Sequence, residues 1–542
     1  MGWAHHFVGL ILGAVLTQGS ALAQEPPHFQ RNGEATQLIV DGAPYLALAG
    51  ELHNSSASSP SYMAPIWDRL TKAGVRTVIG AASWELVEPT EGRFDFTAVD
   101  DEISQARARN VHLVLIWFGA YKNAESTYAP SWVRRDEIRF PRGLRDPAVR
   151  PTGIAAFLHG PILSVFNDRL VAADARAFAG LMRHIRQVDP SGAVIMMQVE
   201  NETGLIGSAR DHSPPANAAW AQQVPAGLMR YLAEHRAGLR PEVAAAWAHQ
   251  GYPNSGTWAE VFGTDATAEQ IFMAWGMGRY VDRVAKAGAA EYALPMYANA
   301  WLGPQPGMVD PGDYPSGGPV ARMMDVWKAA APSLQLLAPD IYVDDFSGTL
   351  ADFRRADNPI FIPEARFDAG NLFVALGQFN AVAFSPFGIE DGGQDDEVFQ
   401  AYRLLNEMTA QITSAQAGGR IRGFRIAGGA QQKVTIGGYD ISITGQRSTV
   451  GAFGPGTGVS EQAKPNGYGL VIETGKDELL VVGRAVDLSF SAPGAQVEVD
   501  SAQEGVFDKG RWVAGRMLNG DERFFLFPKD SLRIVRVNLL RR

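Results

Sequence analysis

Three carboxylates stand where two widely separated apolar runs end. In the segment Gln198-Val-Glu-Asn-Glu-Thr-Gly204, Glu200 and Glu202 lie on either side of Asn201. The segment Phe361-Ile-Pro-Glu-Ala-Arg366 contains Glu364. Two carboxyl groups that flank one bond can cleave a glycosidic linkage, because one protonates the leaving oxygen while the other attacks or stabilises the anomeric carbon. Each segment alone also fits an ordinary polar strand end, so the chemistry depends on what brings the segments together.

The chain offers eight short apolar runs at which buried parallel strands could sit, each followed by a stretch that can form a helix. This pattern predicts an α/β protein built on a (β/α)₈ barrel, in which the ends of strands four and seven lie across the mouth from each other. A doubly wound open sheet is the alternative, but the first unit lacks a glycine-rich nucleotide turn. The runs are 45–50, 76–80, 112–117, 194–199, 294–299, 337–342, 360–363 and 381–385.

The local geometry around these runs is also predictable. Asp41-Gly42 precedes the first run and predicts a hairpin. Side chains alternate along a strand, so Glu200 and Glu202 are expected on one face and Asn201 on the other, provided that the strand continues that far.

The chain divides into three predicted parts. Residues 1–23 resemble a signal peptide, with an apolar run from Phe7 to Leu16 and small residues ending at Ala23, which predicts export to the periplasm or outside the cell; a retained anchor is the alternative. Residues 24–410 would form the barrel, with a helical insertion at 203–293 that shapes the cleft. Residues 411–542 alternate β-branched and polar side chains, which indicates an antiparallel, sandwich-like β domain; the glycine-rich 454–458 is expected to be a loop in it.

Composition excludes several function classes. The formal net charge is −10 and no basic patch stands out, which argues against nucleic-acid binding. There is no cysteine, so disulfides and thiolate nucleophiles are excluded. The motifs of metalloproteases, P-loop proteins and serine hydrolases are missing from the sequence. We therefore expect neither a cofactor nor a metal, and no membrane partner after signal cleavage.

Four segments in barrel order together resemble family 35 of the clan A glycoside hydrolases, over roughly residues 38–390. They are Gln198-Val-Glu-Asn-Glu202, Glu364 at the end of strand seven, Trp84-Glu-Leu-Val-Glu-Pro-Thr-Glu-Gly-Arg-Phe-Asp-Phe96 and Ala49-Gly-Glu-Leu-His53. The resemblance implies that Glu202 is the acid/base, Glu364 the nucleophile, and Asn201 a contact to the sugar 2-hydroxyl. Thr203 and Ala365 depart from the family, which usually has tyrosine at the first position and an aromatic residue at the second.

The resemblance further implies a retaining, exo-acting β-galactosidase, of a bacterial branch that removes β-galactosyl groups from plant polysaccharides such as xyloglucan. Retaining chemistry needs carboxyl groups about 5–5.5 Å apart, and the Glu364 anion would raise the pKa of Glu202 so that it begins protonated. The alternatives are another clan A activity, such as β-glucosidase or α-L-arabinofuranosidase, and a non-catalytic carbohydrate-binding barrel.

The remaining candidates are substrate-binding residues near strand ends. Tyr342 ends strand six, where the clan often places a tyrosine that bonds the nucleophile. The tryptophans could stack on pyranose faces or simply pack the rim, and the polar residues after strand one could hold sugar hydroxyls, although a lone histidine is more often structural. Glu88 and Asp95 are interpreted as turn residues. The other substrate-binding candidates are Trp84, Trp117, Trp301, Glu51, His53 and Asn54.

Overall fold

The computed structural model describes residues 25–147, 160–446 and 466–542. The predicted signal peptide and the 454–458 loop lie outside the described residues. In the part of the chain that the structure describes, no helix combines the length and apolar character needed to cross a bilayer.

Eight parallel strands close into a barrel, and each contains most of one predicted apolar run. Their near-continuous burial is what a sheet covered by helices requires. The predicted (β/α)₈ fold is therefore confirmed. The strands are β4 (Ala47–Glu51), β5 (Thr77–Ser83), β6 (His112–Lys122), β7 (Val194–Asn201), β8 (Met296–Trp301), β9 (Leu336–Ile341), β10 (Phe361–Ala365) and β11 (Ala383–Pro386).

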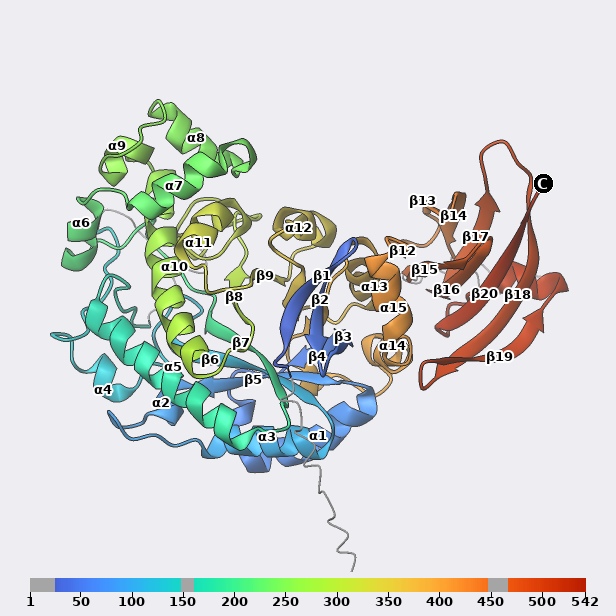
Figure 1. Ribbon diagram of the computed structural model, residues 1–542, viewed down its shortest axis with the longest axis horizontal. Helices are drawn as coiled ribbons and strands as arrows, with labels where there is room; N and C mark the ends of the chain where they lie inside the picture. The colour runs from blue at the N-terminus through green and yellow to red at the C-terminus, as the bar shows by residue number, and fades with distance from the viewer. Residues whose placement is uncertain (1–24, 148–159, 447–465) are drawn as a thin grey trace, which may run out of the picture.

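Each barrel strand is followed by one helix of the outer layer (Figure 1). Several of these helices begin at a side-chain cap: Asn167 Oδ1 accepts from Leu170 N, and Asp265 Oδ1 accepts from Ala268 N. The outer helices are α1 (Pro60–Ala73), α3 (Thr97–Ala108), α5 (Asp168–Val188), α10 (Ala266–Glu291), α11 (Met324–Ala330), α12 (Phe346–Phe353), α13 (Ala369–Gln378) and α14 (Glu397–Asn406); the short α2 (Trp84–Val87) and α4 (Ser131–Arg134) lie in the loops after β5 and β6.

Four further helices between β7 and β8 form a separate group at one end of the molecule (Figure 1). The long α10 packs along α5 and belongs to the barrel wall. The true insertion is thus shorter than the predicted range 203–293. It consists of α6 (Pro214–Trp220), α7 (Ala226–Glu234), α8 (Pro241–His249) and α9 (Trp258–Phe262).

A small antiparallel sheet closes the N-terminal end of the barrel. It contains β1 (His28–Asn32), β2 (Ala35–Val40) and β3 (Ala43–Tyr45). Asp41 and Gly42 join β2 to β3 with φ values of 54° and 74°, which confirms the predicted hairpin. Leu38 and Val40 pack with the inward-facing apolar side chains of the barrel strands, so this end is filled and the opposite end is the mouth.

The C-terminal part is a two-sheet sandwich with its own apolar core, as predicted. The predicted boundary at 410 falls inside α15 (Thr409–Ala417), and the sheets begin after that helix. One sheet has the order β12-β15-β16-β20-β18-β19 and the other the order β13-β14-β17. The strands are β12 (Ile421–Ile426), β13 (Gln431–Ile436), β14 (Tyr439–Gly445), β15 (Gly467–Gly475), β16 (Glu478–Arg484), β17 (Val486–Ser491), β18 (Val497–Asp508), β19 (Arg511–Leu518) and β20 (Arg533–Arg541).

Candidate active site

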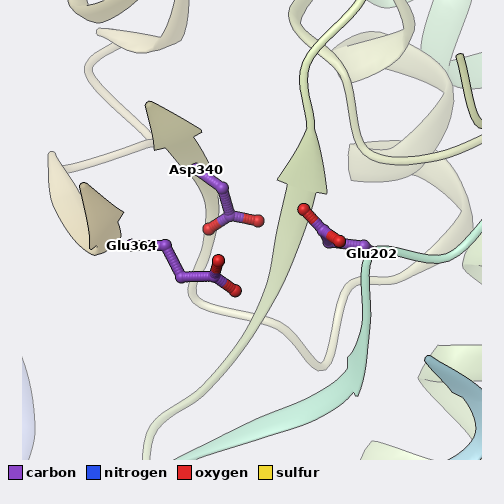
Figure 2. A group of neighbouring side chains, drawn as sticks. All are labelled: Glu202, Asp340 and Glu364. Atoms are coloured by element: carbon purple, nitrogen blue, oxygen red, sulfur yellow. The ribbon is translucent and has the colours of Figure 1, made fainter. Parts of the chain in front are cut away.

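Three carboxyl groups converge at the mouth of the barrel (Figure 2). Glu202 directly follows β7, Glu364 lies in β10, and Asp340 lies in β9 between them. One oxygen from each side chain lies within 4.8 Å of the others, and all three residues are buried. The two predicted acids therefore face each other, and a third carboxyl joins them.

The surroundings of Glu202 favour its protonated form. Burial and the nearby charge of Glu364 raise the pKa of Glu202 to about 8, although Lys122 and a hydrogen bond with Asp340 act in the opposite direction. Its backbone N–H donates to Asn299 Oδ1 at 2.9 Å. A carboxyl group of this kind can donate a proton at neutral pH.

Hydrogen bonds from three side chains hold Glu364 in place. The hydroxyl of Tyr342 donates to Glu364 Oε2 at 2.8 Å, the contact expected for this tyrosine. Glu364 Oε1 lies 3.5 Å from the side-chain amide nitrogens of Asn201 and Asn299. These contacts fix the orientation of the carboxylate that would have to attack.

Asn299 and Asp340 also belong to the site, although no sequence motif indicated either residue. Asn299 Nδ2 donates to Asp340 Oδ2 at 2.8 Å, so Asn299 contacts all three acidic residues of the site. Strand alternation could have identified them. Tyr297 and Ala338 line the barrel interior, so Asn299 and Asp340, two positions later on the same strands, face the mouth. Burial and the neighbouring charges of Glu364 and Glu202 raise the pKa of Asp340.

Lys122 places a buried ammonium among these carboxyl groups and was also missed. Its Nζ donates to Asn201 Oδ1 at 2.9 Å, which orients the Asn201 amide towards Glu364. Lys122 is the last residue of β6 and follows a register shift in the pairing of β6 with β7, between Trp117 and Lys122. It is the cation that opposes the rise in pKa of Glu51, Glu202 and Asp340.

Glu51 reaches the same space from β4. It follows Ala47 and Ala49 on the inward face and is only 1% exposed. Neither of its carboxyl oxygens has a hydrogen-bond partner among the described residues, and burial raises its pKa, with Glu364 adding to the shift. Two buried, unpartnered oxygens beside the acids are suited to receive sugar hydroxyls, the role predicted for this residue.

Glu200 does not share the face of Glu202, because β7 ends at Asn201 and the condition for the expected alternation is not met. Glu200 and Glu202 both adopt left-handed backbone conformations, with φ of 62° and 44°, and this turns successive side chains away from strand geometry. Glu200 Oε2 accepts from Tyr121 N at 2.7 Å, behind the barrel wall. It pairs there with buried Asp174, and burial followed by that neighbouring acid raises the pKa of Glu200.

Two of the predicted sugar-stacking tryptophans cannot perform that role in this structure. Trp117 lies on the outer face of β6, fully buried, and its Nε1 donates to Asp174 Oδ1 at 2.7 Å. Trp84 is fully buried in α2, and its Nε1 donates to Glu88 Oε2. Both tryptophans stabilise loops behind the mouth, and Glu88 anchors one of them.

The last three candidates lie near the mouth. Trp301 ends β8, partly exposed, against the apolar side chains Ala124 and Ile206. His53 Nε2 lies 2.7 Å from Asp391 Oδ2, a contact that positions the ring without a ligand. Asn54 Oδ1 is buried and unpartnered among the described residues. Their contacts with a sugar stay predictions.

The three central carboxyl groups also have the oxygen chemistry that a hard divalent cation prefers. A bound cation would reduce the repulsion among their negative charges, and protonation can do the same. Burial and neighbouring acids raise the pKa values of both Glu202 and Asp340. Carboxyl groups held this close, with the pKa of Glu202 raised to about 8, suit proton transfer and nucleophilic attack on a glycoside.

Two family models match the sequence. The model of glycoside hydrolase family 42, described as "Beta-galactosidase", matches residues 61–265, and a "Domain of unknown function" (DUF5597) matches residues 398–528. A β-galactosidase from Xanthomonas manihotis is 30% identical over 238 residues, which is 41% of this chain and 34% of that protein. The chain thus spans about a third of the length of this curated relative.

Solved structures of two β-galactosidases are also similar. Those from Marinomonas ef1 and Rahnella sp. R3 are 12% and 15% identical, cover 68% of this chain and 62% and 57% of theirs, and have TM-scores of 0.44 and 0.43. The sequence similarity is to β-galactosidases, and because the matching family model is that of family 42, the resemblance to family 35 is not confirmed.

Proposed function

We propose that this protein is a retaining glycoside hydrolase that removes terminal β-galactosyl groups. The observation that carries the proposal is the approach of Glu202 and Glu364 oxygens to within 4.8 Å across the mouth. That separation suits direct attack by one carboxylate, because inverting enzymes need about 6.5–9.5 Å to admit a water molecule. The similarity to β-galactosidases supports the choice of sugar.

In the first step, Glu364 attacks the anomeric carbon while Glu202 donates its proton to the leaving oxygen. The carbon–oxygen bond to the leaving group breaks, and a galactosyl ester forms on Glu364. Esterification removes the charge of Glu364, which had helped to raise the pKa of Glu202. Glu202 can then act as the base that activates water to hydrolyse the ester.

The first experiment measures turnover of aryl β-galactosides by wild type, Glu202→Gln and Glu364→Gln. We expect Glu364→Gln to fall to background, and Glu202→Gln to lose about 10²–10⁴-fold on poor leaving groups but much less on good ones, which need little protonation. Proton NMR of the first product should show the β-anomer.

The matched control is Asp68→Asn, which changes an exposed carboxylate on α1 that pairs with Arg109. It should leave turnover unchanged. Full activity of Glu364→Gln would refute the two-carboxylate mechanism, and an α-anomer as first product would refute retention. Cleavage of β-glucosides or α-L-arabinofuranosides but not of β-galactosides would replace the proposed sugar and keep the mechanism.

We further propose that the natural substrate is a galactosylated plant polysaccharide such as xyloglucan and that the protein acts in the periplasm or outside the cell. The support is the family 35 motif resemblance and the leader-like start of the sequence. Galactose release from xyloglucan oligosaccharides tests the first point. N-terminal sequencing of the protein purified from periplasm and medium tests the second, with Gln24 as the expected first residue.

A further inference from the structure

A groove of about 1150 Å³ opens beside the catalytic mouth. Its walls are α8 of the insertion and α12 of the barrel, and its floor is made by the loops that follow β8 and β9. These elements come from distant parts of the sequence, yet all lie on the side of the barrel where the strands end.

The groove reaches Tyr342, the residue whose hydroxyl contacts the proposed nucleophile. Tyr342 lines it and is 39% exposed, while its hydroxyl donates to Glu364 Oε2. Arg366, two residues after Glu364, also lines the groove and pairs with Asp344 at 2.8 Å. Towards the barrel interior the site is closed by buried residues such as Glu51 and Asp340. A substrate held at the acids can therefore extend outwards along this groove.

The charges on the groove walls are mostly satisfied within the protein. Arg322 pairs with Glu242 at 3.8 Å, and Arg240 donates to the carbonyl oxygen of Asp352. The lining alternates these polar groups with apolar surfaces from proline and leucine, including Pro304, Pro306 and Leu302. Such a surface, without a strong excess of one charge, suits an uncharged ligand with hydroxyl groups and apolar ring faces.

We propose that this groove binds the aglycone of the substrate as a neutral oligosaccharide chain of several sugar units. The proposal rests on the proposed function, because it takes the bond cleaved at Glu202 and Glu364 to be the one between the terminal sugar and this chain. Contacts in the groove add to the binding of long substrates only, so kcat/KM rises with chain length for one and the same terminal galactose.

The test blocks the groove without touching the acids. Ala351 is an exposed residue of α12 that lines the groove, and Ala351→Trp fills the space with a large side chain. Ser347→Trp is the matched control, since Ser347 is exposed on the same helix but does not line the groove. The substrates are an aryl β-galactoside and β-1,4-linked galacto-oligosaccharides from galactobiose to galactopentaose.

We expect kcat/KM of the wild type to increase from galactobiose to galactopentaose. Ala351→Trp should lower it about tenfold for galactopentaose, equivalent to about 1.4 kcal/mol, and leave the aryl galactoside within twofold. Ser347→Trp should match the wild type on both. A flat dependence on chain length, or an equal loss on both substrates in Ala351→Trp, would overturn the groove and leave the proposed function intact.

A second measurement tests binding in the groove even if the proposed catalytic function is wrong. Calorimetric titration with galactopentaose, in the Glu364→Gln background to prevent turnover, should show weaker binding when Ala351→Trp is added. If the wild type cleaves no glycoside, the proposed function fails. The titration still decides the groove, which is refuted if galactopentaose does not bind or binds equally well to both proteins.

Discussion

Lys122 is the residue at which the electrostatics of the site can be tested most directly. Its ammonium lies among Glu51, Glu202 and Asp340 and lowers the pKa of each relative to what burial and the neighbouring acids alone would give. The general acid must be protonated to act, so kcat/KM should fall as the pH rises through the pKa of Glu202, near 8.

Lys122→Met should move this alkaline limb to higher pH, because removal of the positive charge makes the Glu202 proton harder to lose. The hydrogen bond to Asn201 is lost as well, so kcat should also decrease. Lys122→Arg keeps the charge and should keep the limb near its wild-type position. The measurement is a kcat/KM profile with an aryl galactoside, and an unmoved limb in Lys122→Met would contradict the assignment.

Among individual residues, the sequence predicted the two acids Glu202 and Glu364 but not the side chains that contact them. Glu202 and Glu364 could be found because each ends an apolar run in a countable series of strands. Asn299 and Asp340 sit inside runs whose apolar neighbours hide them, and alternation identifies them only once the inward face is known. The position of Glu200 was not predictable, because it follows from two left-handed backbone conformations in non-glycine residues.

Among the elements, α3 carries an unusual buried acid on the outer surface of the barrel sheet. Glu102 is 1% exposed, and neither carboxyl oxygen has a hydrogen-bond partner among the described residues. A Cβ built on Gly80 of β5 would lie 2.1 Å from Glu102 Oε2, so the strand approaches the helix closely at this point. Burial, with a smaller effect from Asp101, raises the pKa of Glu102 well above its ordinary value.

This shift makes stability depend on pH. Because the folded-state pKa is raised, the folded protein holds a proton that the unfolded chain releases, and Glu102 lowers stability increasingly as the pH rises above the unfolded value of 4.5. Glu102→Gln removes that titration. Its Tm relative to wild type should therefore be higher at pH 8 than at pH 4, by a few degrees.

Calorimetry at the two pH values gives the comparison, with Glu234→Gln as the control, an exposed change on α7. An identical Tm difference at both pH values would contradict the interpretation of Glu102 as a buried neutral acid.

The element order itself was well predicted, since all eight strands were located from apolar runs. The size of the insertion was not, because nothing in the sequence of α10 distinguishes a barrel helix from an inserted one.

Across the whole molecule, the apolar core of the barrel's helical layer extends onto one face of the β domain, next to the β domain's own core. The cluster that fills the space between barrel strands and helices continues into Tyr468, Leu470 and Val482 of the six-stranded sheet. Helix α13 packs directly on β12, where a Cβ on Gly423 would lie 2.1 Å from the carbonyl oxygen of Phe373. The two parts should therefore unfold together.

Differential scanning calorimetry of the full chain should give one endotherm, and Gly423→Ala should lower its Tm without splitting it. Gly393→Ala is the matched control, since a Cβ there meets nothing within 4 Å. Two separate transitions, in either the wild type or Gly423→Ala, would show that the domains unfold independently. The domain change was visible in the sequence as a change of periodicity. The packing of the barrel against the β domain was not, because it arises from contacts between α13 and strands far along the chain.

The sheet of β1, β2 and β3, which fills the N-terminal end of the barrel, also determines where the described chain begins relative to the mouth. β1 begins at His28, which pairs with Ile39 of the β2–β3 hairpin, so the first described residues lie at the end opposite the catalytic acids. A protein tethered to a solid support through a linker ahead of residue 25 would therefore present its mouth to the surrounding solution. Bulky polymer chains could reach it there without passing the surface of attachment.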